Sequence, residues 1–557
     1  MVRPTLVKDL ARGPAGSSLE QFTAGRDRLS FIRRDIRTGG QELWRSEGTA
    51  GSTRLVRDLG SGSYGAHAFV TLGDTLFFVA HQSDTGFELW RSDGTRRGTR
   101  LVRDIWPGAI GSQPASLAVL GERLYFSADD GSSGRELWSS DGTARGTRRV
   151  ADLAPGFGGS GPSQLTAVGS TLFFAAVDIA NQEGSSGVEQ WRSDGTAAGT
   201  RLVKDINPTG DAFGPRSSYP RDFTVLGSTL LFTAVDASSG RELWRSDGTA
   251  EGTQRVADLR PGLGIGSEPA NLTPLGDRLL FTAFDADATP TLWLGDGTVA
   301  SPRRLIPLTQ AAGFTAVGDT AFFVNEDRAH GRELWRSDGS RRGTRLLKDL
   351  NLRQGYLSPE SSNPTNLTAF GDSLLFTVAA VSGDGISQGQ ELWRSDGTPA
   401  GTVQVVDLRP GESGSAPERL TVVGERLFFT ADDGRRGREL WSLDVAAVLQ
   451  PPRRAGRPGA AMGNRRSDPL TGLGRSAAAP TGHRPRSRRV ALPDPRRADG
   501  SPGVDPLPLP GLAGEAGAAA TGPNPQGFGW PPAGFDGAMV PQARSLFTPA
   551  AGMHTGP

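Results

Sequence analysis

Apolar residues along most of the chain fall into short runs, separated by clusters of Gly, Asp, Ser and Thr. In the stretch around Trp138 the predicted strands are Ser116–Leu120, Arg123–Ala128, Arg135–Ser139 and Thr147–Leu153. Runs such as Leu76-Phe77-Phe78 place apolar side chains on both faces of a strand, because successive residues point to opposite faces. Such sheets need cover on both sides, and no stretch has the period of a long amphipathic helix.

The sequence ELWRSDGT, or a close variant, recurs along the chain and defines a repeat. Each copy is marked by one tryptophan: Trp44, Trp90, Trp138, Trp191, Trp244, Trp293, Trp335, Trp393 and Trp441. Four-stranded units of this length, covered on both faces by copies of themselves, are typical of propeller blades. A tryptophan in every unit indicates packing between blades rather than a binding site.

The two ends of the repeat region predict ring closure. The last copy stops after its third strand, and Pro4–Leu10 matches a fourth strand such as Thr200–Ile206. We therefore predict an all-β fold, a β-propeller of about nine four-stranded blades over residues 1–445, closed by the N-terminal strand pairing in the last blade. Two smaller rings and an open array are the alternatives.

Residues 446–557 lack the repeat and are rich in Pro, Arg, Gly and Ala. This composition buries too little apolar surface to offset chain entropy and predicts a disordered tail, unless the reading frame shifts there. The tail is basic, whereas the repeat region is mildly acidic and offers no electrostatic footprint for nucleic acid. We expect no nucleic-acid partner and a monomer.

Composition excludes several kinds of chemistry. There are no cysteines, which excludes disulfides, thiolate nucleophiles and Cys-based zinc sites. The five histidines have no metal-ligand spacing, and the G-x-S-x-G, H-E-x-x-H and Walker A motifs are absent. No apolar run is long enough for a transmembrane helix, and no secretory signal is visible at the start.

The repeated ELWRSDGT…GT resembles the bacterial ELWxxDGT repeat proteins, over residues 1–444. The resemblance implies an exported or surface-associated protein without an established enzymatic activity. The missing signal sequence departs from that picture.

The aspartate of each SDGT turn is expected to shape the turn by accepting backbone N–H bonds, because a blade corner is needed in every copy and a catalytic residue only once. These turn residues are Asp93, Asp141, Asp194, Asp247, Asp338 and Asp396.

Two acidic loop pairs, Asp129-Asp130 and Asp432-Asp433, each precede a glycine. Calcium prefers oxygen ligands from such turns, so they are weak candidate calcium ligands, although Asp and Gly are also ordinary loop residues. No other cofactor is expected.

Ligand-binding candidates lie where the chain departs from the repeat, because binding residues concentrate in irregular loops. They are Arg216, Tyr219, Arg221 and Tyr356 in insertions, and Trp106 in the linking segment DIWPGAIG. For Trp106 the favoured interpretation is a wedge that closes the junction between two blades.

The sequence thus favours a non-enzymatic propeller scaffold that binds a protein or a polysaccharide with one face, at the cell surface or outside. A calcium-dependent adhesion module and a glycan-active hydrolase or lyase are the alternatives.

Overall fold

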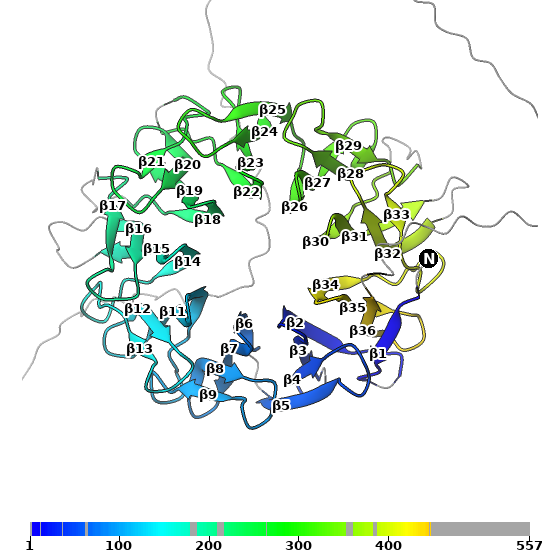
Figure 1. The fold of residues 1–557 in the computed structure, drawn as a ribbon, viewed down its shortest axis with the longest axis horizontal. Coiled ribbons are helices and arrows are strands. Elements are labelled where there is room, and N and C mark those ends of the chain that lie inside the picture. Colours follow the sequence, from blue (N-terminus) through cyan, green and yellow to red (C-terminus); the bar gives the residue numbers. More distant parts are fainter. Residues whose placement is uncertain are drawn as a thin grey trace, which may run out of the picture. The chain divides into compact units, whose positions relative to one another are not determined.

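The computed structural model describes residues 3–444 and 446, apart from 12, 36, 62–64, 179–186, 209–216, 263, 353–359 and 382–386. Within these residues the chain forms nine four-stranded antiparallel sheets around a central opening (Figure 1). The prediction of one nine-bladed ring is confirmed. Among the described residues, no helix has the length and apolar character that crossing a membrane requires.

We number the blades 1 to 9 and name the strands of each blade A to D, from the opening outward. Blades 1 to 3 comprise β2 (Ser18–Ala24), β3 (Leu29–Arg34), β4 (Gly40–Ser46), β5 (Arg54–Ser61); β6 (His67–Leu72), β7 (Thr75–Gln82), β8 (Gly86–Ser92), β9 (Arg100–Arg103); and β10 (Ala115–Leu120), β11 (Arg123–Asp129), β12 (Arg135–Ser140), β13 (Arg148–Arg149). Blades 4 to 6 comprise β14 (Ser163–Val168), β15 (Thr171–Asp178), β16 (Gly187–Ser193), β17 (Arg201–Lys204); β18 (Arg221–Leu226), β19 (Thr229–Asp236), β20 (Gly240–Ser246), β21 (Gln254–Arg255); and β22 (Ala270–Leu275), β23 (Arg278–Phe284), β24 (Pro290–Gly295), β25 (Arg303–Pro307).

Blades 7 and 8 comprise β26 (Ala312–Val317), β27 (Thr320–Asp327), β28 (Gly331–Ser337), β29 (Arg345–Lys348); and β30 (Thr365–Phe370), β31 (Ser373–Val381), β32 (Ser387–Ser395), β33 (Val403–Gln404). Blade 9 combines β34 (Glu418–Val423), β35 (Arg426–Asp432) and β36 (Arg438–Asp444) with β1 (Thr5–Lys8) from the start of the chain.

The N-terminal strand closes the ring, as the sequence predicts. Strand β1 pairs antiparallel with β36, with Leu6 opposite Trp441. Val7 is buried among residues of blades 9 and 1. The closure joins the two ends of the ring and covers the sheet edge that β36 would otherwise expose (Figure 1).

Apolar side chains on both faces of each sheet are explained by the packing of neighbouring blades. For example, Leu137 of blade 3 lies in one buried cluster with Leu172, Phe174 and Trp191 of blade 4. The repeated tryptophan therefore packs between blades.

A cation from strand D also fastens each of several blades to the next. Lys8 donates from Nζ to the carbonyl of Thr53, 2.8 Å away, and lies over the ring of Trp44. Likewise, Arg57 donates to the carbonyl of Thr99 and lies over the ring of Trp90. The closing strand thus makes the same kind of contact with the first blade as strand D of blade 1 makes with blade 2.

One boundary was predicted wrongly. Strand D of blade 3 was expected over Thr147–Leu153, but β13 covers Arg148–Arg149. Val150 still donates its N–H to the carbonyl of Leu137 in strand C, but the N–H of Leu153 bonds to the Glu136 carboxylate instead of a strand partner.

Candidate functional site

The meander of each blade sorts the loops onto two faces. The A–B and C–D turns emerge at one end of the sheet, which we call the turn face. The B–C loops and the links, which run from strand D of one blade to strand A of the next, emerge at the other end, the link face. The described ligand-binding candidates, Trp106, Tyr219 and Arg221, belong to the link face.

The turn face repeats almost without change, and its aspartates form the corner. In Asp141 the Oδ1 atom accepts the N–H and the hydroxyl of Thr143, both within 2.8 Å. These hydrogen bonds lower the pKa of Asp141 below its usual range. Equivalent N–H bonds are made by Asp93, Asp194, Asp247, Asp338 and Asp396.

Arginines tie several of these turns to a neighbouring blade. Arg91 donates to the carbonyl of Gly142, and Arg192 donates to that of Gly248. A recess of about 190 Å³ between blades 5 and 6, beside Arg245 and Asp296, lies on this face. Its volume is below the roughly 300–1,000 Å³ of typical small-molecule sites.

On the link face, the glutamate of each ELW motif holds the link in place. Glu136 is completely buried, and its carboxylate accepts the N–H and the hydroxyl of Ser160, at 2.9 and 2.6 Å. It also accepts the N–H of Leu153 and of Ala154. The same position is buried in seven blades: Glu88, Glu136, Glu189, Glu242, Glu333, Glu391 and Glu439.

Burial raises the pKa of these carboxyls, although the hydrogen bonds from serine and backbone act in the opposite direction. The pKa is raised to about 7 in Glu189, Glu242, Glu333 and Glu391. An aspartate of the same link adds to the rise, as Asp258 does for Glu242. These groups are enclosed by the link, so they serve as fasteners and are not presented to a ligand.

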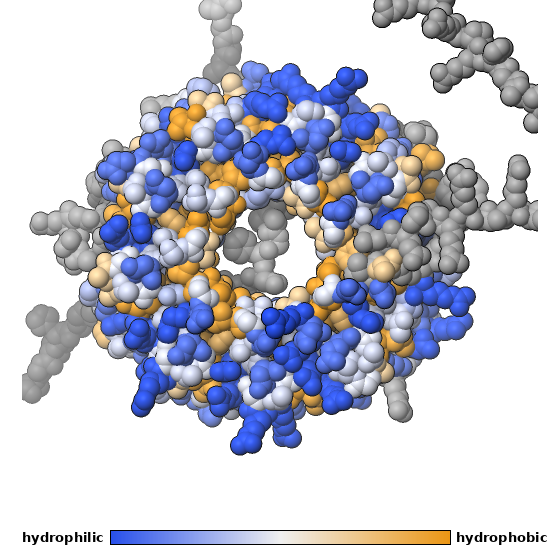
Figure 2. Space-filling view, in the orientation of Figure 1, coloured by the Kyte–Doolittle hydropathy of each residue, from blue (hydrophilic) through white to orange (hydrophobic). Residues whose placement is uncertain are grey.

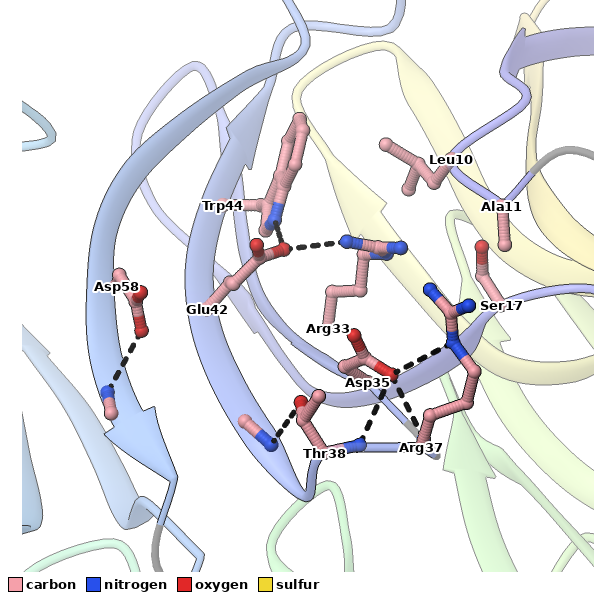
Figure 3. A network of polar contacts seen from close by, with 12 residues as sticks. Leu10, Ala11, Ser17, Arg33, Asp35, Arg37, Thr38, Glu42, Trp44 and Asp58 are labelled. Atoms are coloured by element: carbon pink, nitrogen blue, oxygen red, sulfur yellow. Dashed lines mark hydrogen bonds and ion pairs between the residues drawn. The ribbon is translucent and has the colours of Figure 1, made fainter.

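Two blades depart from this arrangement. In blade 1, Glu42 is only half-buried and accepts from Arg33 and from the indole Nε1 of Trp44, both at 2.8 Å (Figure 3). In blade 6, Thr291 replaces the glutamate, and the buried Asp285 accepts from the Thr289 N–H and pairs with Arg304.

Five of the seven links held by a buried glutamate present one strained residue where the chain enters the innermost strand. These entry positions directly precede a proline and have φ between 43° and 49°: Gln113, Tyr219, Glu268, Asn363 and Ala416. Arginines from strand C donate to three of their carbonyls, as Arg241 does to Tyr219 at 3.0 Å. The backbone is therefore fixed, while the side chain differs at each of the five positions. The sequence analysis singled out Tyr219 and missed the other four, although the recurring Ser-x-Pro was a visible signal.

A second strained position lies three residues further on, in strand A itself. Gln164, Asp222, Asn271, Asn366 and Arg419 all have φ between 54° and 60°. The threonine two residues later donates its hydroxyl to the strained carbonyl, as Thr166 does to Gln164 at 3.0 Å. Strand A lines the opening and begins at the link face, so both strained positions lie where the opening meets the link face. Hydrophobic residues line part of the rim of the opening (Figure 2).

Two of the predicted ligand-binding residues lie together on the link face. Tyr219 is exposed at an entry position. Arg221, two residues later, forms ion pairs with Asp222 and with Glu268 of the next link, each at 3.5 Å. Arg216 and Tyr356 lie outside the described residues.

Trp106 lies between a link and the loop of the following blade. Its indole packs so closely on Gly131 that a Cβ there would come within 2.7 Å of the ring. The side chain is partly buried, which fits the wedge interpretation of the sequence. Arg409 occupies the corresponding place against Gly434.

The four candidate calcium ligands are engaged by their own loops. Asp130 accepts the N–H and hydroxyl groups of Ser132 and Ser133, and although burial opposes ionisation, these bonds lower its pKa to about 2. Asp129 accepts the Gly131 N–H. Asp432 pairs with Arg409, and Asp433 pairs with Arg436. In the described part of the chain no three His, Cys, Asp or Glu side chains gather in a way that could hold a metal ion.

No family model matches this chain, and no curated protein does so either. Among solved structures it is similar to puromycin hydrolase, at 15% identity and a TM-score of 0.34, covering 67% of this chain and 59% of that one. It is also similar to an oligogalacturonate lyase in complex with manganese, at 11% identity and a TM-score of 0.36, covering 78% of this chain and 100% of the lyase chain. The β-propeller domain of the Trilobed protease from Pyrococcus furiosus is similar at 13% identity and a TM-score of 0.32, covering 60% of this chain and 98% of that one. The chain thus spans about three fifths of the hydrolase, and likenesses of this strength carry no argument about function.

Proposed function

We propose that the chain is a non-enzymatic binding scaffold of the ELWxxDGT repeat type, which recognises a protein or a polysaccharide with its link face, at the cell surface or outside. One observation carries the proposal. A repeated frame of buried glutamates and arginines fixes the link backbone, yet each entry position presents a different side chain. Strained residues held by their surroundings are characteristic of functional sites, and preorganised loops bind at lower entropic cost.

The carboxylates support binding rather than catalysis. General acid–base chemistry favours a carboxyl with a pKa near neutrality that touches its substrate. Here the carboxyls with a pKa raised to about 7, such as Glu242 and Glu391, are completely buried and hydrogen-bonded to Ser267 and Ser415. A substrate would have to displace the link to reach them.

The proposal is tested with the full-length chain on an array of defined neutral oligosaccharides, anionic oligosaccharides and peptides. We expect at least one probe to bind, to be recovered chemically unchanged, and to lose most of its affinity with Tyr219→Ala or Glu268→Ala. The control is Val299→Ala, because Val299 is exposed on the turn face.

Three outcomes would contradict the proposal: binding by no probe, equal loss with the turn-face control, or conversion of a bound glycan to product. A rise of the unfolding midpoint with calcium, reversed by chelator, would favour the adhesion-module alternative instead.

A further inference from the structure

Large apolar side chains are exposed in a pattern that follows the ring. In the described chain the strongly exposed ones include Ile110 at 57%, Phe157 at 85%, Tyr219 at 58%, Ile265 at 48% and Leu352 at 58%. Each lies in a link, and the first four occupy four consecutive junctions, from blades 2 and 3 to blades 5 and 6. Val299, at 52%, is their counterpart on the turn face. We call the five link residues the apolar arc.

The links that carry the apolar arc are acidic. Their described acidic residues are Asp104, Asp152, Asp205, Asp258, Glu268, Asp349 and Glu360. Their described basic residue is Arg260. Asp152 is paired with Arg149, and Glu268 is paired with Arg221. Three of the aspartates, Asp104, Asp205 and Asp258, also keep one buried carboxylate oxygen without a hydrogen-bond partner among the described residues. The described links of the arc therefore carry a net negative charge and a negative potential.

We propose that the apolar arc binds a protein segment that combines aliphatic or aromatic side chains with arginine or lysine. This inference rests on the proposed function and selects a protein rather than a polysaccharide as its ligand. Exposed apolar side chains that are rimmed by charge are characteristic of protein interfaces, and complementary charge steers the partner to them.

The composition of the arc argues against the other ligands. Phe157 and Tyr219 have an aromatic face on which a sugar ring could stack, but Ile110, Ile265 and Leu352 have neither such a face nor a hydrogen-bonding group. Anionic polysaccharides and anionic lipid surfaces would be repelled by the acidic links. A second copy of this link face would be repelled in the same way, because its charge has the same sign.

The test uses three synthetic peptides of equal length and the full-length chain. The first peptide alternates Leu and Phe anchors with Arg. The second has Glu in place of Arg, and the third has Ser in place of Leu and Phe. Fluorescence anisotropy should show the first peptide binding at least about tenfold more tightly than either matched peptide, which corresponds to about 1.4 kcal/mol.

Variants then locate the site. The triple variant Ile110→Ser, Phe157→Ser, Ile265→Ser should weaken the binding of the first peptide about tenfold or more, whereas Val299→Ser should leave it unchanged. All the substituted side chains are exposed, so the unfolding midpoint verifies that each variant is folded.

Four outcomes would overturn the inference: equal binding of all three peptides, no binding of the first, no effect of the triple variant, or preferential binding of neutral phosphatidylcholine vesicles through the same residues. If an oligosaccharide from the array binds at Tyr219 while the first peptide does not, this inference fails and the proposed function stands. If neither binds, both fail.

Discussion

The turn face and the link face are made by the same repeat, but they are stabilised differently. On the turn face, exposed aspartates such as Asp247 hold short corners of almost constant sequence. On the link face, buried glutamates such as Glu242 hold segments whose length and exposed side chains vary from blade to blade. The difference shows how buried side chains of a repeat can fix the backbone of a link while the exposed side chains of that link differ from blade to blade.

The largest expected effect is a dependence of stability on pH that comes from the link face. Glu189, Glu242, Glu333 and Glu391 have a pKa raised to about 7 in the folded chain, from an ordinary 4.5. Between these two values the folded state binds more protons than the unfolded state, so stability falls as pH rises and levels off above about 7. The thermal midpoint should therefore be higher at pH 5 than at pH 8.

Two aspartates held by serine and threonine donors, Asp130 in a B–C loop and Asp296 in a C–D turn, act in the other direction and at lower pH. The pKa of Asp130 and of Asp296 is lowered to about 2, so their contribution to the stability of the fold is present above pH 4 and is lost as pH falls below it.

The dependence on the buried glutamates can be tested by substitution. Glu242→Gln should reduce the fall of the thermal midpoint between pH 5 and pH 8. A midpoint that rises from pH 5 to pH 8 would contradict the assignment.

The next effect in size is the loss of one fastener. Glu242→Ala leaves the N–H and hydroxyl of Ser267 buried without an acceptor, which should lower the free energy of unfolding by about 2–5 kcal/mol. The matched control is Glu42→Ala, at the same repeat position but half-buried, with an expected cost of about 1 kcal/mol. Denaturant titration measures both, and equal costs would remove the distinction between the two sites.

A third prediction concerns a defect between blades 4 and 5. Gln190 replaces the leucine of the motif and is completely buried, and its Nε2 and Oε1 have no hydrogen-bond partner among the described residues. Gln190→Leu should therefore raise the free energy of unfolding by about 1–3 kcal/mol. The reverse change at the equivalent position of blade 3, Leu137→Gln, should lower it. Loss of stability in Gln190→Leu would show that the amide has a partner in solution.

The smallest effects belong to exposed residues. Asp247→Ala removes two hydrogen bonds from an exposed turn and should cost about 1 kcal/mol. Phe157→Ser should change stability by less than about 0.5 kcal/mol, because the side chain is exposed. Thermal unfolding of both variants checks the order, and a larger loss for Phe157→Ser would mean that this residue packs against the ring.

The ring itself could be predicted because each copy repeats apolar strands on both faces and the first strand completes the last blade. The fasteners could not be predicted from one motif alone, since Glu189 and its partner Ser218 lie 29 residues apart. The recurrence of the glutamate in eight of the nine copies was the available signal. The apolar arc was hidden for another reason: Ile110 and Phe157 are ordinary residues in the sequence, and only the fold places them on one face.

Amide hydrogen exchange of the full-length chain tests most directly the claim that the links form a preformed, rigid platform. The N–H groups of Ser112, Ser160 and Ser267 bond to buried glutamates, whereas those of Thr95, Thr143 and Thr249 bond to exposed aspartates. The account predicts that the serine amides exchange as slowly as the strands, and that the threonine amides exchange much faster. Serine amides that exchange as fast as the threonine amides would contradict it.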